Sequence, residues 1–204
     1  MLCALLVLSA GCSRPARTAE TSGITPTYDT KTGRLTELAY DSNHNGKVDT
    51  WTAMNGSRAV STRIDTNEDG KIDRWEFYDD QSKLVKVGLS RGDTGKADAW
   101  AYPGADGKTS RVEISASADE KKIDRWEHYK DGTITTAEED TNRDGVVDKW
   151  ETYDAGVLKT ASFDEDGDGK PDRRLSYVAG SLVGIDTDPD GSGGFRKHVA
   201  VAQK

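Results

Sequence analysis

The sequence contains few cysteines, few large apolar residues and few histidines, and each shortage argues against a class of protein. Its 204 residues include 2 Cys, 2 Met, 3 Phe and 3 His, and only 34% are hydrophobic. Such a composition argues against a large globular core, and two cysteines close to the N-terminus leave none to form disulfides within a domain. The formal net charge of -8 argues against nucleic acid as a partner. Something other than bulk apolar burial must stabilise the chain.

The N-terminus predicts export. Residues 1–11 (MLCALLVLSAG) form an uncharged apolar run, which is too short to span a bilayer and has the length of a signal-peptide core. Its end, Leu8-Ser9-Ala10-Gly11-Cys12, resembles the bacterial lipobox, and this resemblance implies a membrane anchor through a lipidated Cys12. The polar, Pro-containing segment that follows predicts a flexible tether. We therefore expect a signal peptide (1–11), a lipidated Cys and tether (12–27), a repeat domain (28–191) and a C-terminal tail (192–204).

The rest of the chain is a tandem repeat. Its five tryptophans recur at spacings of 24, 25, 26 and 24 residues. A Gly stands five residues before four of them, and this register continues through Gly169 and Gly191 without the Trp. Seven copies result, of which the last is truncated. Such periods indicate units that bury their apolar surface only against their neighbours.

Each copy is expected to form a β-hairpin. An aromatic run such as DRWEFY (73–78) is followed within about six residues by a turn signal and then by a run rich in Val, Thr, Ile and Leu. Trp75 and Phe77 would share one face, and Glu76 and Tyr78 the other. The predicted fold is all-β, with hairpins of about 24 residues forming an elongated sheet or solenoid that carries calcium loops along one edge. Whether the repeats form an open sheet, a solenoid or a closed ring stays open.

Acidic loops with metal-ligand spacing separate the hairpins. Four loops carry Asp at position 1, Asp or Asn at positions 3 and 5, Gly at position 6 and Asp at position 9, and a fifth begins in the same way. Oxygen ligands at positions 1, 3 and 5 surround a hard cation, and Gly at position 6 permits the sharp turn. With the Glu at position 12 of two loops, the predicted metal ligands are Asp41, Asn43, Asn45, Asp49, Asp65, Asn67, Asp69, Asp73, Glu76, Asp140, Asn142, Asp144, Asp148, Glu151, Asp164, Asp166, Asp168, Asp172, Asp186, Asp188 and Asp190.

This spacing resembles the calcium loops of EF-hands, dockerins and thrombospondin type 3 repeats. The resemblance implies Ca²⁺ as the cofactor, with Glu76 and Glu151 in the place of the bidentate Glu of an EF-hand. Neither side of a loop has room for a full helix, and both Glu residues fall within predicted strands, so they rank below the Asp ligands. The hairpins also resemble bacterial MORN-type repeats, which are structural or binding modules. Mg²⁺ fits these loops less well than Ca²⁺, because it prefers a near-ideal octahedral geometry in which it retains several waters. Transition metals also fit less well, because they prefer His or Cys as ligands.

Two copies lack the ligands but keep the rest of the pattern. The ligand places hold Ser90, Gly92 and Thr94 before Gly95, and Ala116, Ala118 and Glu120 before Lys121. Both copies retain the Trp and the last Asp of the loop, namely Asp98, Trp100, Asp124 and Trp126. We therefore expect that last Asp and the Trp to serve the fold, and the earlier acids to serve the metal.

These features predict a non-enzymatic, lipid-anchored calcium-binding protein of the cell envelope. The three histidines lie in dissimilar contexts, so no catalytic His with a nucleophile is indicated. The expected partner is a surface protein or a polysaccharide, bound by the copies that lost calcium ligands. The alternative is a calcium-dependent accessory or catalytic subunit of a carbohydrate- or peptide-processing complex. The sequence leaves open whether the anchor at the outer membrane faces the periplasm or the surface.

Overall fold

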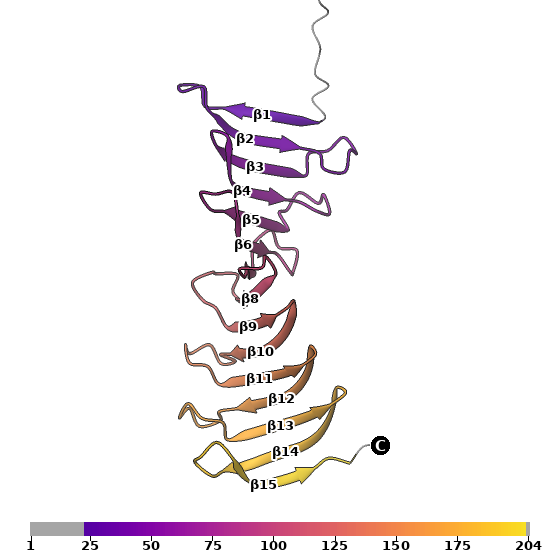
Figure 1. Cartoon of the computed structure of the whole chain (residues 1–204), viewed down its shortest axis with the longest axis vertical. Coiled ribbons are helices and arrows are strands. Elements are labelled where there is room, and N and C mark those ends of the chain that lie inside the picture. Colours follow the sequence, from indigo (N-terminus) through magenta and orange to yellow (C-terminus); the bar gives the residue numbers. More distant parts are fainter. Residues whose placement is uncertain (1–22, 203–204) are drawn as a thin grey trace, which may run out of the picture.

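Residues 23–202 are described by the computed structural model, and they form one open antiparallel sheet in which strands pair in chain order (Figure 1). The 15 strands are β1 (Ile24–Tyr28), β2 (Leu35–Tyr40), β3 (Thr50–Asn55), β4 (Arg58–Ile64), β5 (Arg74–Tyr78), β6 (Leu84–Leu89), β7 (Ala99–Pro103), β8 (Thr109–Ile114), β9 (Arg125–Lys130), β10 (Thr133–Glu139), β11 (Lys149–Asp154), β12 (Val157–Phe163), β13 (Arg173–Val178), β14 (Ser181–Pro189) and β15 (Phe195–Ala200). The predicted all-β fold of tandem hairpins in an elongated sheet is confirmed. Within these residues, no helix has the length and apolar character needed to cross a membrane.

Tight turns and bulges shape every hairpin. In the turns Asp131-Gly132 and Ala155-Gly156 both residues have positive φ, at 52° and 81° and at 48° and 80°, as type I′ hairpin turns require. Close to each turn the register shifts by one residue, for example between Phe77 and Tyr78. A bulge increases the local right-handed twist of a sheet. The strand direction accordingly rotates along the molecule in Figure 1.

The connections fall on two sides of the sheet, because every strand reverses the direction of the one before. Odd-numbered strands from β1 to β13 end in short hairpin turns. Even-numbered strands from β2 onward end in the acidic loops, which we number loop 1 (41–49), loop 2 (65–73), loop 3 (90–98), loop 4 (115–124), loop 5 (140–148), loop 6 (164–172) and loop 7 (190–194). The seven loops thus lie along one side of the sheet, and they follow its twist.

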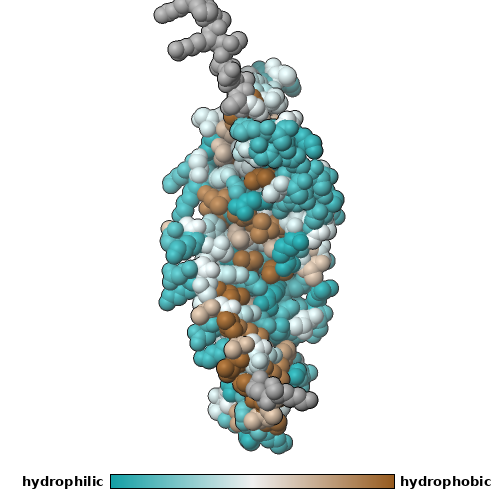
Figure 2. Space-filling model, turned by 90° about the vertical axis from the view of Figure 1, so that its right-hand side faces the viewer, coloured by the Kyte–Doolittle hydropathy of each residue, from teal (hydrophilic) through white to brown (hydrophobic). Residues whose placement is uncertain are grey.

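The sheet is a single layer with a thin core. Only Val87, Ala99, Trp100, Ala137 and Ala161 are buried apolar residues among those described. Figure 2 shows a narrow hydrophobic band along the molecule, bordered by hydrophilic surface. Since strands touch only their neighbours in sequence, each copy depends on the two beside it.

The sheet is longer than the predicted repeat domain at both ends. β1 lies partly in the predicted tether and pairs with β2, with Thr25 opposite Ala39. Its Pro26 is compatible with an edge strand, where an N–H is not needed. β15 lies in the predicted tail and pairs with β14, with Val199 opposite Ile185. The predicted signal peptide and the lipidation site at Cys12 lie outside the described residues.

Candidate metal centre

The loops are shaped by hydrogen bonds from backbone N–H groups to the predicted ligand side chains. In loops 1, 2, 5 and 6, one carboxylate oxygen of the Asp at position 1 accepts the N–H of the Gly at position 6, over 2.6, 2.9, 2.8 and 2.7 Å. That Gly has φ between 82° and 95° in the four loops, so the expected need for Gly is confirmed. The residue at position 3 accepts the N–H of position 5 in each of them. The side-chain oxygens are therefore turned into the loop.

The last Asp of each loop closes it. Its carboxylate accepts the N–H of the second loop residue in all six of loops 1 to 6, including loops 3 and 4, which have Ser in place of the Asp at position 1. This result confirms that Asp49, Asp73, Asp148 and Asp172 serve the fold. It does not exclude them as ligands, since a carboxylate has further lone pairs.

Neighbouring loops are joined through their backbones. The first residue of each of loops 2 to 6 donates its N–H to the carbonyl of the last Asp in the preceding loop. These bonds are Asp65 to Asp49 (2.9 Å), Ser90 to Asp73 (2.8 Å), Ser115 to Asp98 (2.9 Å), Asp140 to Asp124 (2.8 Å) and Asp164 to Asp148 (2.9 Å). The loops therefore form a continuous row.

Loop 6 brings three carboxylates together. One oxygen from each of Asp164, Asp166 and Asp172 lies within 4.8 Å of the others, so this group could hold a metal ion. Burial raises the pKa of the Asp164 carboxyl, but N–H groups from Gly169 and Gly167 outweigh this effect, and the net pKa is lowered. The site is therefore anionic at neutral pH. Asp168 is not part of this group; its Oδ1 accepts the Lys170 N–H over 2.8 Å.

Loop 2 contains a buried carboxylate oxygen without a partner. Asp65 is 5% exposed, and its Oδ2 accepts the Gly70 N–H, whereas Oδ1 has no hydrogen-bond partner among the described residues. The equivalent oxygens of Asp41 and Asp140 face the N–H of position 5 inside their loops, over 3.1 and 3.2 Å. An orphaned buried anionic oxygen is costly. A cation held by loop 2 would give this oxygen its missing partner.

In loops 3 and 4 a serine takes the place of the first Asp. Ser90 Oγ accepts the Thr94 N–H over 3.0 Å, and Ser115 Oγ accepts the Asp119 N–H over 3.2 Å. Loop 4 is one residue longer than the others, so its ligand places fall at Ser115, Ser117 and Asp119. The expected assignment to Ala116, Ala118 and Glu120 was therefore wrong by one residue, because it was counted back from Lys121. Both loops keep the fold of the others although neither has a carboxylate at positions 1 and 3, and loop 4 retains only Asp119 at position 5.

The side chains of the two Glu residues at position 12, Glu76 and Glu151, form hydrogen bonds on the face of the sheet and not in the loops. Their assignment as metal ligands was therefore wrong. Glu76 accepts from Tyr78 and Arg74 on the face of the sheet, and Glu151 accepts from Tyr153 over 2.8 Å. The sequence contained a signal for this role, since the equivalent Glu127 persists in a copy without metal ligands. Tyr129 donates to it over 2.8 Å.

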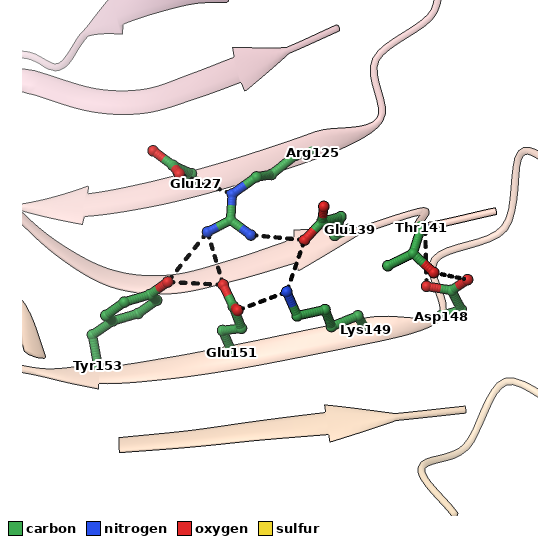
Figure 3. A network of polar contacts seen from close by, with 8 residues as sticks. All are labelled: Arg125, Glu127, Glu139, Thr141, Asp148, Lys149, Glu151 and Tyr153. Carbon is green, nitrogen blue, oxygen red and sulfur yellow. Dashed lines mark hydrogen bonds and ion pairs between the residues drawn. The ribbon is translucent and has the colours of Figure 1, made fainter. Parts of the chain in front are cut away.

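Glu151 belongs to a cluster of five charged side chains across β9, β10 and β11 (Figure 3). Arg125 donates to Glu127 (2.9 Å), Glu139 (3.0 Å) and Glu151 (2.7 Å). Lys149 bridges the last two, at 3.0 and 2.9 Å. The side chains of Arg125 and Glu151 are only 18% and 9% exposed. The cluster was not predicted from the sequence, because its members lie on three strands.

The expected fifth calcium loop does not form as the others do. Asp186 and Asp188 lie within β14, and the Asp186 carboxylate binds His198 (2.7 Å) and Arg174 (3.0 Å). Only Asp190 lies in loop 7, where its Oδ1 accepts the N–H of Ser192 and Gly194. The physical reason is length, since β14 runs to Pro189 and leaves a five-residue loop without an Asp at position 9.

Comparisons with known proteins identify no family. No family model and no curated protein matches the sequence. Among solved structures, the chain is similar to TarM (14% identity, TM-score 0.40), over 49% of this chain and 19% of that one. A mutant of S. aureus TarM in complex with fondaparinux, alpha-GlcNAc-glycerol and UDP gives 14% identity over the same shares, at TM-score 0.39. The accessory secretory proteins 1, 2 and 3 of Streptococcus pneumoniae give 13% identity and TM-score 0.39, over 52% of this chain and 19% of that chain. This chain thus spans about a fifth of those proteins, and the likenesses carry no argument about activity.

Proposed function

We propose that this protein is a calcium-stabilised, non-enzymatic repeat scaffold of the cell envelope, anchored through a lipid on Cys12. Calcium would bind in loops 1, 2, 5 and 6, where Asp or Asn occupies positions 1, 3 and 5. The observation that carries the proposal is the convergence of Asp164, Asp166 and Asp172 within 4.8 Å in loop 6. The orphaned oxygen of Asp65 supports it independently.

The donor chemistry favours calcium over other cations. All side-chain donors at positions 1, 3, 5 and 9 of these loops are oxygens from Asp or Asn, which are ligands of hard cations. Ca²⁺ accepts six to eight such oxygens in flexible geometry, whereas Mg²⁺ keeps several waters. Calcium outside the cell is near millimolar, so sites with Kd of about 10⁻⁴ to 10⁻³ M suffice for a constitutive structural role.

A single charge removal in loop 6 tests the metal assignment. We expect Asp166→Asn to weaken the binding of one Ca²⁺ by about ten-fold or more, because ligand charge sets the affinity of such loops. The measurement is calorimetric titration of the full chain with Ca²⁺. Glu165→Gln is the matched control, since Glu165 is adjacent, carries the same charge and binds Arg173 over 2.7 Å instead. Equal isotherms for both variants and the wild type would contradict the assignment of loop 6.

A hollow beside the two metal-free loops favours a second role, the binding of a polysaccharide. Strand β5 contributes Trp75 and Phe77, and loop 4 contributes Asp119 and Glu120. Trp100 of β7 also lines the hollow but is only 4% exposed, so Trp75 and Phe77 supply the aromatic surface. Aromatic faces stack on sugar rings, and carboxylates accept hydrogen bonds from sugar hydroxyls. The hollow lies only partly in the copies that lost calcium ligands, where we expected a partner to bind, because Trp75 and Phe77 follow loop 2, which keeps its ligand pattern.

Replacement of one tryptophan separates this role from the scaffold. We expect Trp75→Ala to abolish retention of the protein in affinity electrophoresis through gels that contain purified cell-wall polysaccharides. Trp150→Ala is the matched control, because it removes the same residue of another copy, outside the hollow. The polysaccharide role is wrong if no gel retards the wild type, or if both variants are retarded equally. In the first case a surface protein becomes the expected partner.

A further inference from the structure

The residue at position 4 contacts the preceding loop in loops 2, 3 and 5, through Glu68, Asp93 and Arg143. It adopts positive φ in loops 2, 3, 4 and 5, at Glu68 (58°), Asp93 (52°), Ala118 (54°) and Arg143 (62°), a conformation that is uncommon for residues other than Gly. Loop 6 has Gly167 there, with φ 80°. Side chains at this position form contacts between neighbouring loops.

The charge of the side chain at position 4 differs according to whether the preceding loop has the calcium-ligand pattern. Glu68 faces loop 1, and Asp93 lies 3.8 Å from Lys71 of loop 2, so the two acids face loops that carry ligands. Arg143 lies 3.7 Å from Asp124 of loop 4, which has Ser at positions 1 and 3 and so lacks the ligand pattern. Negative charge is thus added beside predicted cation sites, and positive charge beside a loop without one.

Glu68 makes the most extensive of these contacts. Its Oε1 accepts hydrogen bonds from Asn43 Nδ2, over 2.6 Å, and from Asn45 Nδ2. Its Oε2 lies 3.5 Å from Lys47 Nζ, and its side chain is only 14% exposed. Because both amide nitrogens point at Glu68, both Oδ1 atoms point into loop 1, where they accept the N–H groups of Asn45 and Lys47.

Loop 1 has fewer ligand carboxylates than the other predicted calcium loops. Its positions 3 and 5 are both Asn, so only Asp41 and Asp49 carry charge, whereas loop 6 has Asp at all four places. Amide oxygens are weaker ligands for Ca²⁺ than carboxylates, and affinity depends on the ligand charge. Glu68 supplies a third carboxylate from outside the loop and fixes the orientation of the two neutral ligands.

A separate observation indicates a ligand in the loop that carries Glu68. The buried Oδ1 of Asp65, in loop 2, has no partner among the described residues, and the Asp65 N–H donates to the Asp49 carbonyl of loop 1 over 2.9 Å. A cation that engages Asp65 would therefore order a loop that contacts loop 1 through both backbone and side chain.

We propose that loops 1 and 2 form one coupled pair of calcium sites, in which Glu68 of loop 2 acts as a positioning carboxylate for the calcium bound by loop 1. This inference rests on the proposed calcium function and extends it. Binding in loop 2 holds Glu68 in place, so it raises the affinity of loop 1. Loop 6 has Gly167 at the same position, so loops 5 and 6 lack this link.

The test exploits that natural difference. Glu68→Gly installs the residue that loop 6 already has, in a backbone conformation that Gly adopts readily, so the loop keeps its fold. Calorimetric titration of the full chain with Ca²⁺ should show one site weakened about 10- to 100-fold, as for residues that orient metal ligands. Glu68→Gln, which still accepts from both amides but lacks the charge, should bind with intermediate affinity. Arg143→Gly, the same change facing a loop that lacks the ligand pattern, should weaken no site, although the loss of a positive charge from loop 5 can strengthen the site there.

The outcomes separate this proposal from the calcium function itself. If the wild type binds no Ca²⁺, the proposed function fails and the coupling with it. If the wild type binds four Ca²⁺ and Glu68→Gly gives the same isotherm, the calcium function stands and the role of Glu68 is overturned. Equal weakening by Arg143→Gly would overturn it as well, because the effect would then be general to position 4.

Discussion

Chelation of calcium will lower the melting temperature of the protein by more than about 20 °C. At about 100 times its Kd, each bound ion adds roughly 2.7 kcal/mol to the folded state, and four loops have the complete ligand pattern. In a chain of this size, 1 kcal/mol corresponds to about 2–4 °C. Without the metal, the chain keeps a formal charge of -8, and its acids repel each other within single loops. Circular dichroism in 10 mM CaCl₂ and in EGTA at matched ionic strength measures the difference.

The loss of structure should be unequal along the sheet. Loops 3 and 4 hold their shape through Ser90, Ser115 and their closing Asp residues, so hydrogen exchange in EGTA should stay slowest in β6 to β9. The strands beside loops 1, 2, 5 and 6 should exchange faster. MgCl₂ in place of CaCl₂ is the control for ionic strength. Superimposable melting curves in calcium and EGTA would refute the stabilising role.

Replacement of Arg125 by Met will destabilise the protein by about 2–3 kcal/mol in saturating calcium. The change leaves Glu127, Glu139 and Glu151 facing one another with only Lys149 to balance them. Breaking a buried ion pair typically costs about 3–5 kcal/mol, and the partial exposure of this cluster reduces that figure. Urea denaturation measures the effect. Arg74→Met is the matched control, since among the described residues Arg74 forms an ion pair only with Glu76 and its side chain is 38% exposed, so its loss should cost under about 1 kcal/mol.

The pH dependence provides a check on the cause. Burial raises the pKa of Glu151, but hydrogen bonds from Lys149, Tyr153 and Arg125 outweigh it, and the net pKa is lowered. Ionised Glu151 therefore stabilises the folded state above its unfolded pKa of about 4.3, and this contribution disappears as the pH falls through the folded value. The difference between the wild type and Arg125→Met should shrink in that acidic range. A constant difference would attribute the effect to lost packing.

The sequence predicted features that repeat, because repetition separates structural from variable positions. The recurrence of Trp with a closing Asp in copies that lack ligands predicted that Asp98 and Asp124 serve the fold, and their hydrogen bonds agree. The alternation of Trp75, Glu76 and Tyr78 also placed side chains on the expected faces, as the bond between Tyr78 and Glu76 shows.

Other features could not be predicted, because they arise between copies. The contact of Glu68 with Asn43 and Asn45 spans about one repeat, and position 4 varies from copy to copy because each residue suits a different neighbour. The Arg125 cluster likewise joins three strands. The match of Glu76 and Glu151 to position 12 of an EF-hand was misleading, since a strand begins directly after the loop and carries these side chains onto the face of the sheet.

Each described strand contacts only the strands next to it in the sequence. Evolution can therefore change the length of the molecule by gaining or losing whole copies. Duplication or deletion of one whole copy adds or removes two strands, or about 10 Å of length, without disturbing contacts elsewhere. Length can therefore be varied by recombination between copies, while the chemistry of each loop changes independently. Under the proposed anchor at Cys12, the number of copies would set the distance at which the far end of the sheet meets a partner.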